Sequence, residues 1–311
     1  MHRYIIKRLL LMIPTILGVI FIVFTIMSFT PGDPGRIMLG VKASPEAVEA
    51  MNEKLGYNKP FFERFFMYIG RLLKGDLGNS YKNNQPVFDE IMKRFPTTFN
   101  IAVLAVSFVA IVGIPLGVFS AVKQYSLLDY STTIFSLIFA AAPSFWLGLL
   151  SILLFSLVLG WLPPNGIGSF KHYILPVVTL SLTAAAGTAR NTRALMLEAI
   201  RQDYVRTARG KGASETRVIW KHTIKNALMP VITSMGMAFA SLLGGTLVTE
   251  QVFGIPGLGT LIITAINNKD VPQVMAVTIF LSAIFCVIML VVDLIYAYID
   301  PQVKAMYTGK R

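Results

Sequence analysis

The chain has 311 residues, of which 54% are hydrophobic and only 14% are charged, and its mean hydropathy is +0.64. A soluble domain of this length cannot bury so much apolar surface, so the composition indicates a polytopic membrane protein. The net charge of +12 does not indicate nucleic-acid binding, because the lysines and arginines gather at the ends of apolar runs, as the positive-inside rule predicts. The single cysteine, Cys286, excludes an internal disulfide framework and a thiolate metal site.

Apolar runs long enough to cross a membrane occur six times, since a helix needs about 20 residues to span about 30 Å of hydrocarbon. The third run is long enough to be tilted or broken near Pro143. We therefore expect an all-α membrane protein with six transmembrane helices. In chain order the predicted spans are Leu9 to Phe29, Thr98 to Val122, Thr132 to Leu159, Tyr173 to Ala194, Met229 to Thr249 and Val274 to Ile299.

Basic residues predict the orientation of these spans. Arg3, Lys7 and Arg8 precede the first run, which exceeds a signal-peptide core in length and is followed by no A-x-A cleavage motif, so we expect a retained helix with a cytoplasmic N-terminus. Six crossings return the basic tail, residues 301–311, to the cytoplasm. The segment 190–225 contains nine basic and three acidic residues and is cytoplasmic in the same topology.

The predicted organisation has four parts. Residues 1–30 form the N-terminal start and first span, 31–97 an extracytoplasmic helical segment, 98–300 a core of five spans with a cytoplasmic loop at about 196–228, and 301–311 a tail. This architecture is that of a multi-pass membrane protein.

Two helices are expected in the extracytoplasmic segment. Ser44 precedes Pro45 as an N-cap, and a second helix, rich in phenylalanine, begins near Pro60 and ends near Lys74-Gly75. The second helix suits the lipid interface. Composition leaves open whether this segment delivers substrate or only packs on the outer ends of the spans.

Ionisable groups are nearly absent from the spans. Asp129, Glu250 and Asp293 lie near span ends, and Arg190 and Arg193 can reach the cytoplasm by snorkelling. This pattern disfavours a proton relay or a side-chain sodium site, although backbone carbonyls at a broken helix could still bind sodium.

Catalytic and nucleotide motifs are also missing from the sequence. The Gly-Lys pair at 210–211 is followed by Gly212 and Ala213 instead of Ser or Thr, so it is not a phosphate-binding loop. The three histidines show no H-E-x-x-H spacing. We expect no enzymatic activity, no metal site and no cofactor bound by this chain.

Small residues predict close helix packing in two spans. Gly236, Ala240 and Gly244 recur at four-residue intervals, and residues 184–189 are mostly alanine and glycine. Ordinary packing within the membrane is the favoured interpretation of both stripes, over a sliding or pore-lining surface.

The cytoplasmic loop is predicted to form two short helices. The first is amphipathic, covers Glu198 to Arg209 and ends at Gly210 and Gly212. The second has Ser214 as N-cap and continues until Pro230 opens the next span. A protein partner or a lipid-headgroup surface would each suit such a loop.

Motifs in this loop resemble a known family. Thr207-Ala208, then Gly212, then Asn226-Ala227-Leu228-Met229-Pro230 are similar to the "EAA" loop of permease subunits of binding-protein-dependent ABC importers. Arg206 and Thr207 replace the acidic residue and first alanine of the general pattern, and the loop is longer than in maltose-type permeases. Both departures resemble the peptide and nickel permease branch.

Four further motifs resemble the first permease subunit of dipeptide and oligopeptide importers, and they extend the likeness over nearly the whole chain. They are Gly75-Asp76-Leu77-Gly78-Asn79-Ser80, Pro143-Ser144-Phe145-Trp146-Leu147-Gly148, Leu159-Gly160-Trp161-Leu162-Pro163 and Glu250-Gln251-Val252-Phe253-Gly254-Ile255-Pro256-Gly257-Leu258-Gly259.

The resemblance implies a type I ABC importer transmembrane domain in a bacterial or archaeal plasma (inner) membrane, which moves dipeptides, oligopeptides or a related solute such as nickel by alternating access. Its implied partners are a second homologous permease, two ATP-binding subunits that use ATP and Mg, an extracytoplasmic solute-binding protein and membrane lipid. The alternative from another class is an ATP-independent secondary transporter or channel with a regulatory surface loop.

The resemblance also implies roles for particular residues. The extracytoplasmic element comprises Glu250, Phe253, Gly254, Pro256, Gly257 and Gly259. The ATPase-coupling loop comprises Arg206, Thr207, Ala208, Gly212, Ala213, Ser214, Glu215 and Val218.

Overall fold

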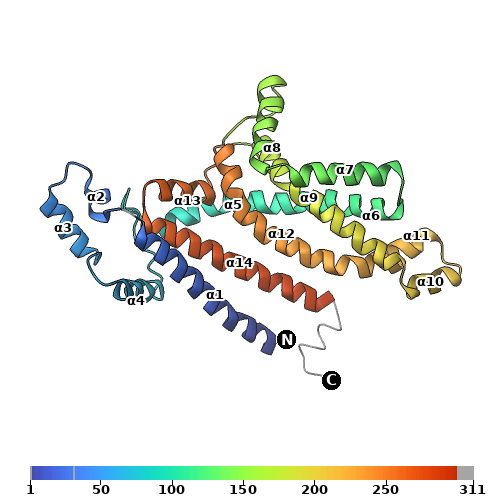
Figure 1. The fold of residues 1–311 in the computed structure, drawn as a ribbon, viewed down its shortest axis with the longest axis horizontal. Coiled ribbons are helices and arrows are strands. Elements are labelled where there is room, and N and C mark those ends of the chain that lie inside the picture. Colours follow the sequence, from blue (N-terminus) through green and yellow to red (C-terminus); the bar gives the residue numbers. More distant parts are fainter. Residues whose placement is uncertain (1, 31, 300–311) are drawn as a thin grey trace. The chain divides into compact units, whose positions relative to one another are not determined.

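A computed structural model describes residues 2–30 and 32–299, and within these ranges the regular secondary structure is helical apart from an isolated antiparallel bridge between Asn79 and Pro86 (Figure 1). The predicted cytoplasmic tail, residues 301–311, lies outside the described residues. The elements are α1 (His2–Phe29), α2 (Pro34–Leu39), α3 (Pro45–Lys54), α4 (Phe61–Leu72), α5 (Val87–Phe108), η1 (Val109–Gly113), α6 (Ile114–Val122), α7 (Leu127–Ala141), α8 (Ser144–Ser151), η2 (Ile152–Val158), α9 (Lys171–Ile200), α10 (Asp203–Gly210), α11 (Glu215–Arg217), η3 (Val218–Thr223), α12 (Ile224–Val252), α13 (Leu258–Asn267) and α14 (Val271–Ile299), where η marks a π-helical segment.

Among the described residues, five helices are long and apolar enough to cross a membrane, or six if one bent pair counts as a single span. The bent pair is Leu127–Ala141 with Ser144–Val158, and its two arms meet at 101°. Ala142 is extended at the bend because Pro143 follows it, and proline disfavours a helical conformation in the residue before it. The predicted break near Pro143 is confirmed, and with this pair counted as one, the spans number the predicted six.

Two compact units divide the chain. One contains Thr98–Ile255 with short terminal pieces, and the other contains Ile6–Thr97 and Pro256–Cys286.

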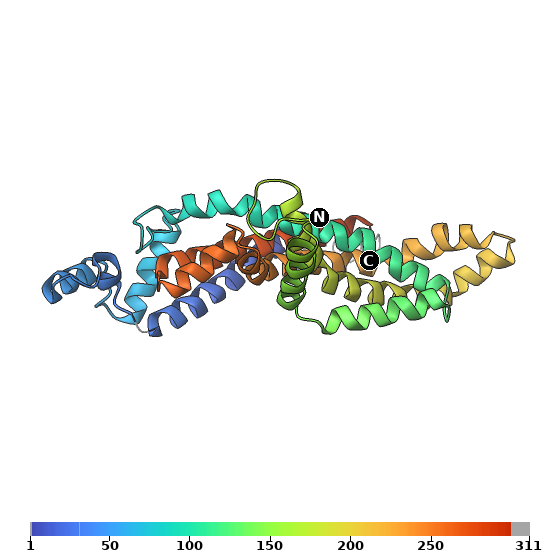
Figure 2. The same ribbon diagram turned by 90° about the horizontal axis from the view of Figure 1, so that it is seen from above.

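Helix α9 is the centre of the first unit and packs against α6, η1, α7, α8 and α12 (Figure 2). Its alanine stretch permits this, because glycines on the facing helix let the two backbones approach. A Cβ on Gly113 would lie 2.9 Å from the carbonyl oxygen of Ala185, and one on Gly117 would lie 2.5 Å from that of Ala189. The prediction of close packing around residues 184–189 is confirmed.

The helix that contains α12 starts earlier than predicted. It runs without interruption from Glu215 through η3, and Pro230 lies inside it instead of opening it. Proline removes one backbone donor from a helix, and a long membrane helix tolerates that loss where neighbouring groups satisfy the freed carbonyl.

The second unit is built around aromatic contacts between α1 and α4, against which α14 packs Met275 and Ile279. Phe24 of α1 and Tyr68 of α4 are buried together with Met275 of α14. The two helices predicted for residues 31–97 are present as α3 and α4, and the Ser44 hydroxyl accepts a hydrogen bond from the Ala47 amide at 3.3 Å, as an N-cap does.

A short helix that the sequence pattern did not predict, α2, is joined to α3 by Asn52. The amide side chain of Asn52 donates to Asp33 and accepts from the Gly35 amide, each at 2.8 Å. The hydrogen bond from Asn52 holds the pKa of Asp33 below its usual range.

Candidate functional site

The predicted loop folds into a hairpin of α10, α11 and η3, residues 201–223, which we call the coupling hairpin. It does not begin at Glu198 as predicted, because α9 continues through Ile200 and the chain breaks at Arg201 and Gln202. Met196 and Ala199 pack in a buried cluster with α6, which extends α9 beyond what the amphipathic pattern suggested.

The turn of the hairpin depends on Gly212. Its φ is +80°, a left-handed conformation that glycine adopts without strain. The Gly212 amide donates to the Arg209 carbonyl at 2.9 Å, and the Ala213 amide donates to the Ala208 carbonyl at 3.2 Å. In the described chain a Cβ at Gly212 would have no neighbour within 4 Å, so the turn is confirmed but close approach within the chain is not what selects glycine.

The underside of the hairpin is apolar. Val205 of α10 and Val218 of η3 are fully buried, and Ile219 joins the cluster formed by α6 and α9. The Thr223 hydroxyl donates to the Val218 carbonyl at 3.1 Å, and this bond satisfies a carbonyl in the π-helical segment. These contacts attach the hairpin to the membrane helices.

The outer side of the hairpin is basic and aromatic. Arg209 forms a two-pronged ion pair with Glu215 across the turn, at 2.7 and 3.2 Å. Trp220 is 59% exposed on η3, and Arg206 is exposed near Asp203. Exposed tryptophan and arginine are typical of binding hot spots.

The remaining predicted coupling residues also lie in this hairpin. The Thr207 hydroxyl donates to the Asp203 carbonyl at 2.9 Å, and Ala208 is half-buried in α10. Ser214 occupies the N-cap position of α11, but within the described residues its side chain makes no capping hydrogen bond.

A buried ion pair that the sequence interpretation missed lies at the junction of α6, α7 and α9. Asp129 is 3% exposed, and it accepts from Arg193 through two atoms at 2.6 and 2.8 Å. Ser120 donates to the same carboxylate, as does the amide of Tyr125, at 2.9 Å. The sequence interpretation gave Arg193 no partner, whereas the structure shows its guanidinium held by Asp129.

The signal for this pair was present in the sequence. Asp129 and Arg193 both lie at span ends that the topology places on the same side, and a buried carboxylate needs a cation. Helical spacing alone could not show that α7 and α9 are neighbours.

The three small residues of α12 have different surroundings. A Cβ on Gly236 would lie 2.2 Å from a methyl group of Val292, and Ala240 is buried. Gly244 is exposed, and a Cβ there would have no described neighbour within 4 Å. The close contact at this stripe is therefore formed by Gly236.

The predicted extracytoplasmic element begins in the first unit. The Thr98 hydroxyl donates to the buried carboxylate of Glu250 at 2.6 Å, and Phe253 packs close to Gly148. Gly254 has a φ of +57°, and the Phe253 carbonyl before it accepts from the Gly166 amide at 2.9 Å.

The element continues in the second unit. Pro256 is exposed. Gly257 precedes α13, and the Gly257 amide donates to the Thr260 hydroxyl oxygen at 3.1 Å. Gly259 is buried inside α13.

No group of three or more His, Cys, Asp or Glu within residues 2–30 and 32–299 is placed to hold a metal ion. The structure offers surfaces for partners: a basic and aromatic hairpin attached to a helical membrane unit.

Comparisons with known proteins agree with this arrangement. Residues 113–305 match the family model described as the binding-protein-dependent transport system inner membrane component, and residues 1–102 match its N-terminal counterpart. The chain is 38% identical to the dipeptide transport system permease protein DppB of Alkalihalophilus pseudofirmus, over 98% of this chain and 100% of that protein. It is 41% identical to the glutathione transport system permease protein GsiC of Escherichia coli O6:H1, over 98% and 99%.

Solved structures show the same fold. An inward-facing form of the MetNI methionine ABC transporter superposes with a TM-score of 0.58 at 18% identity, covering 70% of this chain and 99% of that one. An amino acid ABC transporter with histidines gives a TM-score of 0.50 at 16% identity, covering 69% and 94%. At these identities the likeness concerns the fold alone.

Proposed function

Because the chain belongs to the family of inner-membrane components of binding-protein-dependent transport systems, we propose that it serves an ATP-driven importer of short peptides. It is a multi-pass permease subunit of an ABC importer, and no observation supports the ATP-independent alternative. The proposed substrate class follows from the relatives, since one is named for dipeptides and another for glutathione, which is itself a short peptide.

The coupling hairpin is the observation that supports an external source of energy. It presents Trp220 and several arginines to solvent, while Val205 and Val218 are buried beneath it and Ile219 packs against α6 and α9. A partner that binds this surface can move α9 and α12, because both helices join the hairpin directly. We propose that this partner is a pair of ATP-binding subunits, which use ATP and Mg. We assign no ATP site and no Mg site to this chain.

Alternating access follows if those subunits bind the hairpin with different affinity in two states. ATP binding would close the two ATPases, displace the hairpins of two permeases and favour the outward-facing state. The equilibrium shifts only by the difference in the partner's affinity for the two states.

A second permease subunit has an apolar surface available to it. Helices α7, α8 and η2 expose many large side chains, including Phe135, Trp146 and Leu157. In a membrane such a surface contacts lipid or another helical subunit. We propose the second permease for part of it, and an extracytoplasmic binding protein as the source of substrate.

The test is a Trp220→Ala variant in the full chain, purified in mild detergent with its copurifying subunits identified by mass spectrometry. We expect the wild type to retain two ATPases and a second permease, and Trp220→Ala to lose most of the ATPase, since a hot-spot tryptophan contributes about 2 kcal/mol or more to binding. Trp161→Ala is the matched control, because Trp161 is also well exposed but lies outside the hairpin.

Import distinguishes the substrate class. Cells that contain the wild-type importer should accumulate a labelled dipeptide, and cells with Trp220→Ala should not. Copurification of the ATPases without any dipeptide or tripeptide uptake would contradict the peptide assignment. Unchanged ATPase recovery in Trp220→Ala would contradict the docking assignment.

A further inference from the structure

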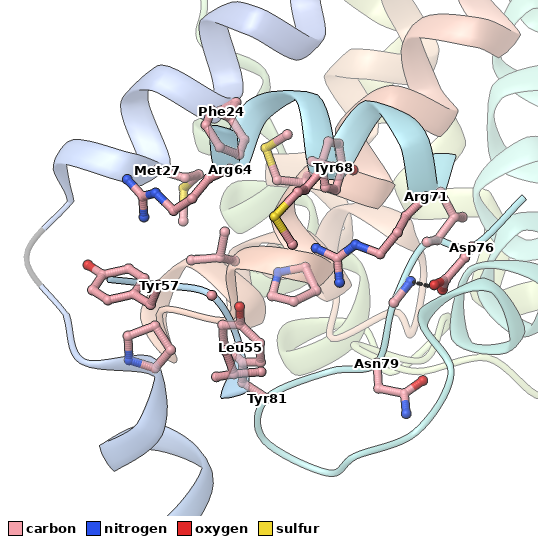
Figure 3. A pocket seen from close by; sticks show the side chains of 18 of the residues that line it. Phe24, Met27, Leu55, Tyr57, Arg64, Tyr68, Arg71, Asp76, Asn79 and Tyr81 are labelled. Carbon is pink, nitrogen blue, oxygen red and sulfur yellow. Dashed lines mark hydrogen bonds between the residues drawn. The ribbon is translucent and has the colours of Figure 1, made fainter. Parts of the chain in front are cut away.

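A cavity of about 460 Å³ lies within the second unit, beneath α4 (Figure 3). Its walls come from the last turns of α1, the start of α14, helix α4 and the loop 76–84. Nothing in the transport mechanism above uses it.

The cavity lies at the depth of a membrane surface. The candidate span of α1 ends at Phe29, and Phe24, Met27 and Ser28, which line the cavity, occupy its last two turns. Residues this close to the end of a span are at the boundary between hydrocarbon and headgroups. The opposite face of α4 exposes Phe62 and Phe66, as a helix lying on that boundary does.

Positive charge dominates the lining. Lys54, Arg64 and Arg71 contribute three cations against the single carboxylate of Asp76, an excess of two. Asp76 also accepts a hydrogen bond from the Gly78 amide at 2.8 Å, which Figure 3 shows at the edge of the cavity. Among the described residues, none of the three cations has an ion pair within 4.0 Å.

Two polar atoms in the lining are buried without a hydrogen-bond partner in the described chain. They are the hydroxyl of Tyr68, whose side chain is 8% exposed, and Nε of Arg64. The rest of the Arg64 guanidinium lies over the ring of Tyr57, with its central carbon 5.0 Å from the ring centre. Buried donors of this kind are costly unless a ligand or water satisfies them.

Tyr68 and Tyr81, two of the three tyrosines that line the cavity, are neutral donors at physiological pH. Burial raises the pKa of Tyr68 above its usual range and that of Tyr81 to about 12. The lining combines arginine and tyrosine donors with apolar groups such as Met27, Leu55 and Met275, and this combination suits a ligand with an anionic head and an apolar body.

We propose that this cavity binds the phosphate of an anionic membrane phospholipid, with Arg64, Arg71 and the Tyr68 hydroxyl as its donors and the acyl chains leaving along α1. The bound lipid would join α4 and the loop 76–84 to the ends of two membrane helices. The proposal concerns this unit alone and does not depend on which solute the importer moves.

The test is native mass spectrometry of the full chain, with its copurifying subunits, released from nanodiscs that contain phosphatidylglycerol and phosphatidylcholine in equal amounts. We expect the wild type to retain phosphatidylglycerol selectively. The double variant Arg64→Ala, Arg71→Ala should bind it about tenfold more weakly or worse, since hydrogen bonds to charged groups are strong. Lys74→Ala is the matched control, because Lys74 is a basic, exposed neighbour of α4 that does not line the cavity.

Tyr68→Phe keeps the shape of the side chain and removes only the hydroxyl, so it tests the site even if the double variant fails to fold. We expect severalfold weaker retention of phosphatidylglycerol. Equal retention in Tyr68→Phe and wild type, or in the folded double variant and wild type, would overturn the proposal.

The source of the phosphate is tested by competition. Inorganic phosphate at millimolar concentration should leave lipid retention unchanged if the acyl chains contribute to binding. Displacement of phosphatidylglycerol by inorganic phosphate at that concentration would overturn the lipid assignment and leave a site for a free anion.

Discussion

The coupling hairpin and the contact between α6 and α9 belong to the same unit but are held by different interactions. The hairpin depends on local backbone hydrogen bonds around Gly212, and its outer surface is solvated. The α6–α9 contact depends on Gly117, which faces the Ala189 carbonyl oxygen, and on Ser120, which donates to Asp129 of α7, the partner of Arg193 on α9. A surface meant for a partner can be adjustable, whereas a close helix contact tolerates little change.

The largest expected effect is on the ion pair. Asp129→Ala leaves the Arg193 guanidinium, which is 28% exposed, without its carboxylate, and we expect a loss of about 3 kcal/mol in the free energy of unfolding. Asp203→Ala, on the solvated side of the hairpin, should change it by less than about 0.5 kcal/mol. Denaturant unfolding in detergent, followed by circular dichroism, measures both.

The double variant Asp129→Ala, Arg193→Ala sharpens this result. It should be more stable than Asp129→Ala alone, because the unpaired charge is gone. Equal stability of Asp129→Ala and wild type would show that the α6–α9 contact does not depend on this pair.

The second effect tests the glycine contact. Gly117→Ala places a Cβ 2.5 Å from the Ala189 carbonyl oxygen, so the helices must separate, at a cost of about 1 to 3 kcal/mol. Gly187→Ala, on α9 itself, meets no described neighbour within 4 Å and should stabilise the helix by about 0.5 kcal/mol. The two substitutions should shift the midpoint of thermal unfolding in opposite directions. Shifts in the same direction would contradict the role of Gly117.

A smaller effect is expected where the neighbour can move. The nearest atoms to a Cβ on Gly236 all belong to the Val292 side chain and none to the backbone, so Gly236→Ala should cost about 1 to 2 kcal/mol. Gly244→Ala is its control in the same helix. Thermal unfolding of the two variants should separate them, and identical midpoints would show that the α12 stripe is not a close contact.

The smallest effect on stability is expected in the hairpin. Gly212→Ala places a side chain in a left-handed conformation and should cost about 1 kcal/mol, confined to the hairpin. Gly210→Ala has equally open space in the described structure and a helical backbone, so it should be neutral or stabilise the helix by up to about 0.5 kcal/mol. Hydrogen exchange in α10 reports the local cost, and transport-coupled ATP hydrolysis should fall only in Gly212→Ala.

Much of the fold followed from local pattern. The six apolar runs, the break at Pro143, the capped helix after Ser44 and the phenylalanine-rich helix after Pro60 all depend on neighbouring residues, and all are present. The start of the hairpin was misplaced because buried Met196 and Ala199 extend α9, and Pro230 was mistaken for a helix start because a membrane helix can contain proline.

The candidate site was partly predictable for the same reason. Glycine at 212 predicts a turn by its own conformational freedom, and the structure has one. The roles of Arg206, Thr207 and Glu215 in coupling remain predictions from the family resemblance.

By itself the sequence determined that the chain is a helical membrane protein. It also determined where most of the spans lie and which segment between them is a basic loop. Both follow because hydropathy and charge act on each segment separately. Only the tertiary structure decided that Asp129 meets Arg193, that Gly117 faces Ala189 and that Arg64, Tyr68 and Arg71 border one cavity. Those neighbours are far apart in the chain or on separate helices, and the packing of whole helices, which no local pattern encodes, brings them together.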